Sequence, residues 1–296
     1  MPKMPAPTDA AGLRPMHALA ASFVHWAVGT EGSSRSSALI RIGLAMLFWS
    51  RWAGELLFYM DQSPIGLFLA ANFFVATTLL FVGYQSRAAA VWTGAVGLAM
   101  YYYFGFQFGR EPWTHHHTYL LAVAALLIAL TPCDRSYSLD RYLAVMRAER
   151  AGLPAPAERG NLWGLRLIVV QLCVLYFFAA FDKSSYAFLS GARIEAIFLW
   201  YYAGSDYPAG LAWFATIASV AVVALEYSLA FGLPFRATRR YLLLPGLAFH
   251  AIIYVTLPVY TFSATMVLLY LAYFDADAVD KVIARLQGIG LKEEIS

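Results

Sequence analysis

Residues 112–121 read PWTHHHTYLL and join three consecutive histidines to an apolar run that continues to Thr131 without a charged residue. As a helix, this run is roughly one membrane thickness long. The arrangement predicts a membrane helix at 115–131 whose titratable rings lie at its border. Residues 181–184, FDKS, are a second polar cluster at the end of an apolar run, and their lysine is the predicted partner of these rings.

Composition places the rest of the chain in the same class. Of 296 residues, 60% are hydrophobic and 13% are charged, whereas charged residues approach a quarter of an ordinary soluble protein. The net charge of +3 is small and its basic residues are spread along the chain, which argues against a nucleic-acid partner. We predict an all-α, polytopic transmembrane helical bundle with interfacial amphipathic helices, in contact with membrane lipid.

The hydrophobic pattern predicts about eight membrane spans. Fifteen Lys and Arg residues fall in segments on the same side as the N-terminus, and only Arg110, Lys183 and Arg193 fall on the other side. Because cytoplasmic loops are enriched in Lys and Arg, both termini are expected in the cytoplasm of a multi-pass protein of the plasma or inner membrane. The predicted spans are 38–60, 65–83, 88–108, 115–131, 162–182, 209–231, 240–257 and 259–274.

Segments outside these spans also have helical patterns. Apolar residues at helical spacing predict interfacial amphipathic helices at 16–28, from Leu139 to Met146, and in the tail from Val279 to Leu286. The outer connection 183–210 is long and aromatic, and we expect a helix at 194–202 that covers whatever the spans enclose. The predicted organisation is a cytoplasmic N-terminal segment at 1–35, a transmembrane domain at 36–275 and a short cytoplasmic amphipathic tail at 276–296.

Adjacent histidines on a helix point in different directions, because neighbouring residues are about 100° apart. The run therefore does not converge on one metal ion, and since no His or Cys metal-ligand spacing exists elsewhere, no metal is expected. Two interpretations of the run remain open. The rings are polar groups at the interface beside Trp113 and Tyr119, or one of them, best assigned to His117, faces the bundle interior as an acid, base or hydrogen-bond donor.

Lys183 follows a predicted span and lies near its outer end. It either extends to the interface or is covered by the aromatic connection, where desolvation would give a neutral amine able to act as a base. His250 and Glu226 lie within spans, so each is either functional or a hydrogen-bonding group between helices. Arg51 and Glu55 are four residues apart and predict an ion pair on one helix face.

Several short motifs, in their order and spacing, resemble the membrane domain shared with vitamin K-dependent γ-carboxylase, which is called the HTTM domain. The resemblance covers residues 36–275, nearly all of the chain. The motifs are LIRIG at 39–43, WTHHHTYL at 113–120, SLD at 138–140 after Pro132, AAFDK at 179–183 continuing to SG at 190–191, and His250 in the seventh span.

The resemblance implies a site on the outer face of the membrane. Lys183 matches the lysine that deprotonates vitamin K hydroquinone in the carboxylase, and His117 matches a histidine placed at that site. These two are the expected catalytic residues. His250, Tyr119 and Trp113 are the expected cofactor-binding residues, and a reduced quinone is the expected cofactor.

Two functions from different classes follow. The first is an enzyme that resembles the carboxylase and acts on a quinol or isoprenoid lipid through a lysine base. The second is a non-catalytic membrane accessory protein for the maturation or export of a secreted peptide or a partner protein, because the carboxylase has a large lumenal region for which this chain has no counterpart. A transporter is less well supported, since the sequence has no inverted repeat.

Overall fold

The computed structural model describes residues 24–58, 63–203, 206–274 and 276–286. These residues are mostly helical, which confirms the all-α prediction; one short two-stranded sheet accompanies the helices. The chain forms two compact units. Unit 1 comprises Met1–Leu167 with Phe274–Ser296, unit 2 comprises Ile168–Tyr273, and each is described by itself.

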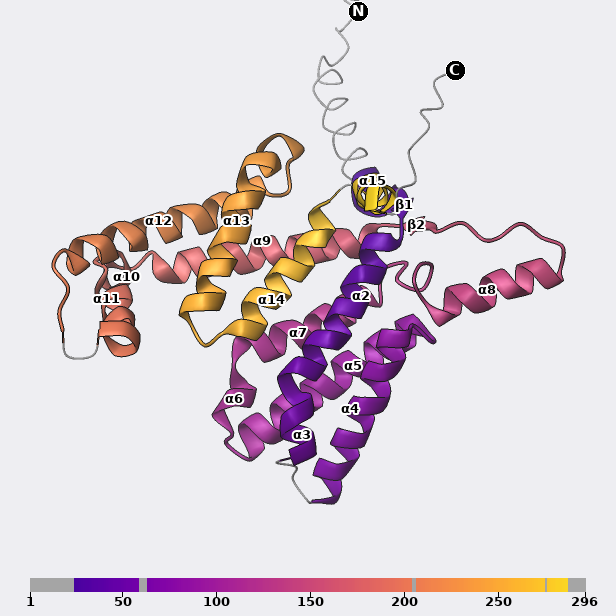
Figure 1. Cartoon of the computed structure of the whole chain (residues 1–296), viewed down its shortest axis with the longest axis horizontal. Helices are drawn as coiled ribbons and strands as arrows, with labels where there is room; N and C mark the ends of the chain where they lie inside the picture. Colours follow the sequence, from indigo (N-terminus) through magenta and orange to yellow (C-terminus); the bar gives the residue numbers. More distant parts are fainter. Residues whose placement is uncertain (1–23, 59–62, 204–205, 275, 287–296) are drawn as a thin grey trace, which may run out of the picture. The chain divides into compact units, whose positions relative to one another are not determined.

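Unit 1 is built on a helical bundle in which α2 packs against α4 and α7, and α5 packs against the same two helices (Figure 1). Its antiparallel strands pair Glu31 with Asn161 and Ser33 with Arg159. Its elements are the π-helical turn η1 (His25–Gly29), β1 (Glu31–Ser33), α2 (Arg35–Phe48), the π-helical η2 (Trp49–Ala53), α3 (Gly54–Phe58), α4 (Pro64–Val82), α5 (Ser86–Met100), the π-helical η3 (Tyr101–Gln107), α6 (Glu111–Thr114), α7 (His116–Ile128), α8 (Leu139–Arg150), β2 (Arg159–Asn161) and α15 (Ala276–Leu286).

Unit 2 begins within α9 (Trp163–Lys183), which starts in unit 1. Within unit 2, α12 packs against α11 and α13, and α13 packs against α14. The remaining elements of this unit are α10 (Tyr186–Leu189), α11 (Ala192–Phe198), the π-helical η4 (Leu199–Ala203), α12 (Leu211–Gly232), α13 (Arg236–Thr256), α14 (Tyr260–Leu269) and the 3-10 turn η5 (Tyr270–Tyr273).

Local sequence explains where α4 begins and ends. Ser63 caps the first turn because its hydroxyl accepts a hydrogen bond from Gly66 N at 3.0 Å, and Pro64 occupies the first helical position, where no amide hydrogen is needed. At the other end Gly83 adopts φ +75°, a conformation that favours glycine. These signals fix the turn that leads from α4 into α5.

Seven of the eight predicted spans coincide with one helix or with a helix continued by a π-helical or 3-10 segment. The first span, 38–60, covers α2, η2 and α3 up to Phe58, the last described residue of this segment. Three helices of the described chain are long and apolar enough by themselves to cross a membrane: Pro64–Val82, Trp163–Lys183 and Leu211–Gly232. The number of membrane crossings and the side on which the termini lie stay predictions. The main local difference from prediction is His115, which is extended and separates α6 from α7 instead of opening the helix.

The predicted helices outside the spans were placed well where the structure describes them. α8, α15 and the α11–η4 pair occupy the segments expected to be helical. Most of the predicted helix at 16–28 lies outside the described residues. The position of α8, α15 and the α11–η4 pair at a membrane interface stays a prediction, because it depends on where the bilayer lies.

Arg41, in α2, holds the turn between α4 and α5 in place through hydrogen bonds to backbone carbonyls. Its fully buried guanidinium donates to the carbonyl oxygens of Leu80 at 2.6 Å and Phe81 at 3.1 Å, and to Tyr137 O at 2.6 Å. A Cβ at Gly83 would lie 2.3 Å from Arg41 Nη1, so glycine gives the guanidinium room. Arg41 thus supplies donors to carbonyls at the end of α4, where helical partners are lacking.

Asp140 holds the other side of the same turn. Its carboxylate accepts hydrogen bonds from Gln85 N and Ser86 N, both at 2.8 Å, and from the Ser86 hydroxyl at 2.7 Å. A carboxylate at a helix N-terminus is favourable because the first amide groups lack helical acceptors. Arg41 and Asp140 therefore account structurally for two of the short motifs, LIRIG and SLD.

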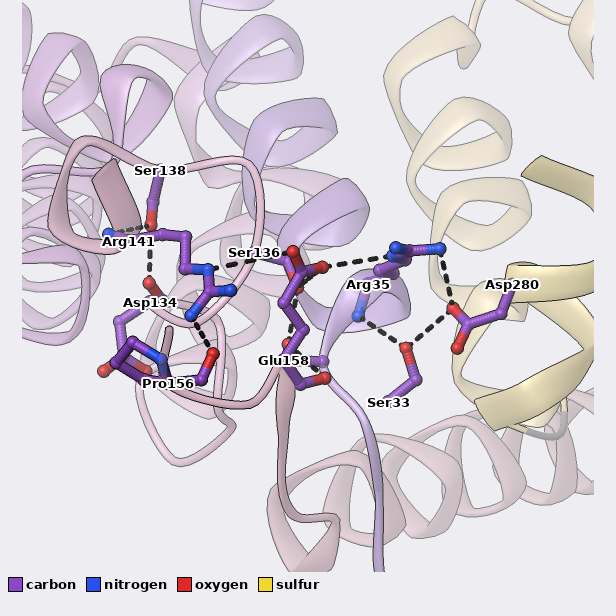
Figure 2. A network of polar contacts seen from close by, with 10 residues as sticks. Ser33, Arg35, Asp134, Ser136, Ser138, Arg141, Pro156, Glu158 and Asp280 are labelled. Atoms are coloured by element: carbon purple, nitrogen blue, oxygen red, sulfur yellow. Dashed lines mark hydrogen bonds and ion pairs between the residues drawn. The ribbon is translucent and has the colours of Figure 1, made fainter. Parts of the chain in front are cut away.

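Glu158 is the centre of a second polar cluster in unit 1, the Glu158 network (Figure 2). Its carboxylate lies between the Arg35 guanidinium, at 3.1 Å, and the Arg141 guanidinium, at 3.7 Å. Arg35 also contacts Asp280 of α15 at 3.5 Å, and the Ser33 hydroxyl donates to the same carboxylate at 2.8 Å. The network joins the start of α2 to the linker before β2 and to the tail helix.

Candidate functional site

Lys183, the last residue of α9, forms an ion pair with Glu226 of α12. Its ammonium Nζ lies 2.9 and 3.0 Å from the two carboxylate oxygens and donates to Ala179 O at 3.3 Å. The Glu226 side chain is 5% exposed and that of Lys183 29%. The carboxylate is therefore held inside the unit, while the Lys183 side chain is partly exposed.

The buried position of Glu226 follows from the pattern of α12. Ser219, Val223, Glu226 and Ala230 are buried residues three or four positions apart, so they form one face of the helix. A carboxylate on such a face is costly unless it is paired. Lys183 provides that pairing across two helices, and both sequence-based interpretations of Glu226, a functional group or a structural contact between helices, stay open.

A chain of hydrogen-bonding side chains lies in the same unit. The Tyr176 hydroxyl is 2.6 Å from His250 Nε2 and 2.6 Å from the Tyr270 hydroxyl. All three side chains are 1% exposed. Tyr176 and Lys183 are seven residues apart on α9 and so share a helix face, about 10 Å apart along the axis. We call Tyr270, Tyr176 and His250 the relay triad.

Gly246 of α13, which follows Pro245, makes room for the relay triad. A Cβ at Gly246 would lie 2.4 Å from the Tyr270 hydroxyl and 3.0 Å from Leu229 Cδ2, so a side chain at this position would displace Tyr270. Pro245, inside the helix, has no amide hydrogen to donate to the preceding turn. Gly246 therefore allows the hydroxyl of Tyr270 to approach α13 one turn before His250.

The predicted residues of unit 1 belong to an aromatic cluster. Trp113 is buried, stacks on Trp52 with ring centroids 5.4 Å apart, and lies 4.8 Å from Phe104. Tyr119 is 48% exposed, and its ring lies 6.0 Å from that of Tyr101. Trp113 is thus a core residue of this cluster, while Tyr119 lies at its surface.

The three histidines differ in burial. His117 is 8% exposed, His116 is exposed, and the extended His115 has its ring 5.1 Å from that of His117. Arg51 lies at the entrance to the histidine run, where it donates to Pro112 O at 3.1 Å and pairs with Glu55 at 2.8 Å. The predicted Arg51–Glu55 ion pair is confirmed.

The structure thus brings together some predicted residues and adds others. Lys183 and His250 belong to unit 2, whereas His117, Trp113 and Tyr119 belong to unit 1, so the pairing of Lys183 with His117 stays a prediction. Sequence reasoning overlooked Tyr176 and Tyr270. Tyr176 could have been found from its spacing of seven residues before Lys183, but Tyr270 carries no comparable signal.

The chemistry available in unit 2 is that of proton exchange. A lysine–glutamate pair can take up one proton at the carboxylate while the ammonium remains, or can exist as a neutral amine and acid when water is excluded. The relay triad adds two hydroxyls and an imidazole, each able to donate or accept a hydrogen bond. Within the described residues, no group of three or more His, Cys, Asp or Glu side chains is arranged to hold a metal ion.

A family model for the HTTM domain matches residues 60–277. The matched range contains the histidine run, the Lys183–Glu226 pair and the relay triad. No curated protein and no solved structure matches the chain. The family match covers most of the chain, and the apolar helices are those of a membrane protein. The chain therefore belongs to the HTTM domain family of membrane proteins.

Proposed function

We propose that unit 2 holds the acid–base site of a membrane enzyme that acts on a lipid-soluble quinol or related isoprenoid lipid. The observation that carries the proposal is the ion pair of Lys183, part-exposed, with the buried carboxylate of Glu226. A purely structural ion pair in this place is costly compared with apolar packing. The presence of the pair is explained if it exchanges a proton with a ligand.

The roles of the two residues follow from their exposure. Lys183, the more exposed of the two, meets the ligand and attracts an oxygen that is losing its proton. Glu226 fixes the ammonium in place and accepts the proton, which leaves a neutral acid beside the remaining positive charge. The proton acceptor is then the Lys183–Glu226 pair, whereas the sequence suggested a neutral Lys183 acting alone.

The surroundings of the pair favour an apolar ligand. Phe177 lies one turn before Phe181 on α9, with ring centroids 6.3 Å apart, and 5.9 Å from the ring of Tyr227, which neighbours Glu226. Aromatic side chains of this kind bind flat apolar rings, and a few polar groups orient them. A quinol combines such a ring with an acidic hydroxyl, so it suits both parts of the site.

The test uses the full chain in lipid nanodiscs with reduced 2-methyl-1,4-naphthoquinone and oxygen. We expect oxygen uptake above the rate of spontaneous oxidation, reduced at least tenfold in Lys183→Met and in Glu226→Gln. Arg193→Met is the matched control, because Arg193 is an exposed cation in the same unit. His117→Ala tests the predicted role of that ring separately.

Three results would overturn the proposal. They are uptake equal to that of empty nanodiscs, uptake unchanged in both variants of the pair, or equal loss in the Arg193→Met control. Specific recovery of one secreted peptide with the inactive chain would then favour the accessory function. A change confined to His117→Ala would move the site to unit 1.

A further inference from the structure

An asparagine lies on the exposed surface of unit 1, near the middle of a helix that is apolar enough to cross a membrane. Asn72 belongs to α4, Pro64–Val82, and at 1.5 Å per residue it lies about 12 Å from one end of this helix and about 15 Å from the other. Its side chain is half-buried, and Phe68 and Val75, on the same face, are 66% and 48% exposed. In a membrane protein, such a surface at the middle of a spanning helix faces hydrocarbon.

The amide of Asn72 is oriented by two hydrogen bonds. Its Nδ2 donates to Phe68 O in the preceding turn at 2.8 Å, and its Oδ1 accepts from the indole Nε1 of Trp92 at 3.1 Å. Trp92 belongs to α5, which packs against α4 (Figure 1). Because an indole nitrogen only donates and a backbone carbonyl only accepts, these partners fix which amide atom is oxygen and which is nitrogen.

These two bonds leave half of the amide unused. A carboxamide carries two N–H groups and an oxygen with two acceptor positions. One N–H and one acceptor position of Asn72 therefore have no partner among the residues that the structure describes. Hydrocarbon offers neither a donor nor an acceptor, and an unpaired polar group in it is costly. The surface thus fits a partner that supplies one donor and one acceptor at the same point.

A second copy of Asn72 meets this requirement. Its own unused acceptor and N–H are the complement of those on the first copy, and a two-fold axis beside the residue brings both into place at once. Hydrogen-bonded amides are a recurrent way of joining membrane helices. A lipid acyl chain has no such groups.

We propose that the chain forms a two-fold symmetric dimer through the exposed face of α4 and α5, with reciprocal hydrogen bonds between the two Asn72 side chains. In each copy one N–H of Asn72 donates to Oδ1 of the other copy. Trp92 is a positioning residue, because its indole holds Oδ1 in the orientation that presents the free N–H. Phe68 and Val75 surround the amides with apolar packing.

Energy transfer between copies of the full chain labelled with donor and acceptor fluorophores at the C-terminus tests the proposal. Dilution with lipid in liposomes gives the dissociation constant of the dimer within the membrane. Asn72→Leu should raise this constant about tenfold, the effect of losing two hydrogen bonds between membrane helices. Trp92→Phe keeps an aromatic ring but removes the N–H, and should raise the constant about threefold, because the amide remains and loses only its orientation.

The matched control is Thr78→Val, which removes another exposed polar group of the same helix. Thr78 lies six residues after Asn72, so it points about 120° away around the helix axis. Its replacement should leave the dissociation constant unchanged. The comparison separates the Asn72 surface from a general effect of polarity on α4.

Crosslinking tests which face of α4 meets its copy. In a Cys173→Ala background, with the fully buried Cys133 left in place, a short bifunctional thiol reagent should link Val75→Cys into a dimer. Thr78→Cys should be linked far less. Adding Asn72→Leu to Val75→Cys should lower the yield of linked dimer.

Several results would overturn the proposal. They are a chain that stays monomeric at every protein-to-lipid ratio, a dissociation constant unchanged by Asn72→Leu, an equal rise in Thr78→Val, and equal crosslinking from the two cysteine positions. Lys183→Met should leave the dissociation constant unchanged, because the Lys183–Glu226 pair belongs to unit 2. The dimer is thus tested independently of the proposed enzyme.

Discussion

The two units bury charged side chains in different ways. In unit 1 the guanidinium of Arg41 is bonded to three backbone carbonyls, which belong to the end of one helix and to a turn. In unit 2 the ammonium of Lys183 is bonded to the carboxylate of Glu226, and His250 to the hydroxyl of Tyr176. The first arrangement binds a side chain to the backbone, whereas the second binds side chains to one another.

This difference separates structural from chemical roles. Backbone carbonyls cannot be protonated near neutral pH and hold their place in the fold, so the hydrogen bonds of Arg41 have a structural role. Carboxylate, imidazole and hydroxyl groups exchange protons and can change partners. A buried charge in a membrane helix is thus interpreted by the nature of its partners, in addition to its depth.

The largest effect on stability should come from removing the Arg41 hydrogen bonds in unit 1. Arg41→Met leaves the carbonyls of Leu80 and Phe81 without their donor, and we expect a loss of about 3–5 kcal/mol of stability, because several buried groups lose a charged partner together. Thermal unfolding in detergent, followed by tryptophan fluorescence, measures the change. Arg87→Met, at an exposed ion pair with Asp134, should cost under about 1 kcal/mol.

Equal destabilisation by the two arginine variants would show that the buried hydrogen bonds of Arg41 contribute no more to stability than the exposed ion pair of Arg87. Oxygen uptake gives a second measurement. A variant of Arg41 that still folds at low temperature should retain the uptake that depends on Lys183, since the Lys183–Glu226 pair belongs to the other unit.

A smaller effect is expected from breaking the ion pair in unit 2. Lys183→Met leaves the Glu226 carboxylate buried and unpaired, at a cost of about 2–3 kcal/mol, reduced from the fully buried case by the exposure of Lys183. Replacing both residues with methionine should recover most of this loss, because no buried charge remains. Thermal unfolding of both single variants and the double variant gives the coupling energy.

The outcome for the double variant is decisive for the comparison. A double variant that is stable but inactive shows a pair kept for its chemistry. If the double variant is as unstable as the single ones, the pair has a structural role like that of Arg41, and the acid–base proposal loses its main support.

Much of the fold could be predicted from the sequence, because long apolar runs leave few alternatives to a helix. Segment ends were predicted well where a cap, a proline or a glycine marks them, as at Ser63 and Gly83. The π-helical segments and the extended His115 were not predicted, since they depend on packing between segments. Local periodicity does not contain that information.

The candidate site could be predicted only in part. Lys183, Glu226 and His250 stand out because they are ionisable residues in apolar segments. Their partners do not stand out, since a tyrosine such as Tyr176 or Tyr270 is common in membrane helices and its role depends on contacts between helices distant in sequence. Which predicted residues meet is a property of packing, and the resemblance to a family did not supply it.

A modest effect is expected from a single methyl group in α13. Gly246→Ala places a Cβ 2.4 Å from the Tyr270 hydroxyl, so Tyr270 must move away, at a cost of about 1–3 kcal/mol. Gly54→Ala is the matched control, because its Cβ meets no atom within 4 Å, and helix propensity predicts a gain of up to about 1 kcal/mol. Thermal unfolding compares the two variants. Equal stability of the two variants would show that Tyr270 can move away from α13 without cost.

The smallest effect concerns Cys133, a buried thiol close enough to Arg41 for its charge to act on it. Burial raises the pKa of the thiol to about 11, while the positive charge of Arg41 acts in the opposite direction. A raised pKa means that the thiolate forms only well above neutral pH, so at pH 8 about one thiol in a thousand is reactive. Iodoacetamide should label Cys133 in the folded protein far more slowly than in the protein unfolded by SDS. In Arg41→Met the labelling rate should rise. Loss of the Arg41 hydrogen bonds should open the turn and expose the thiol, and this effect should outweigh the loss of the positive charge. A lower rate in this variant would show that the turn stays closed without Arg41, and that Arg41 affects the thiol only through its charge.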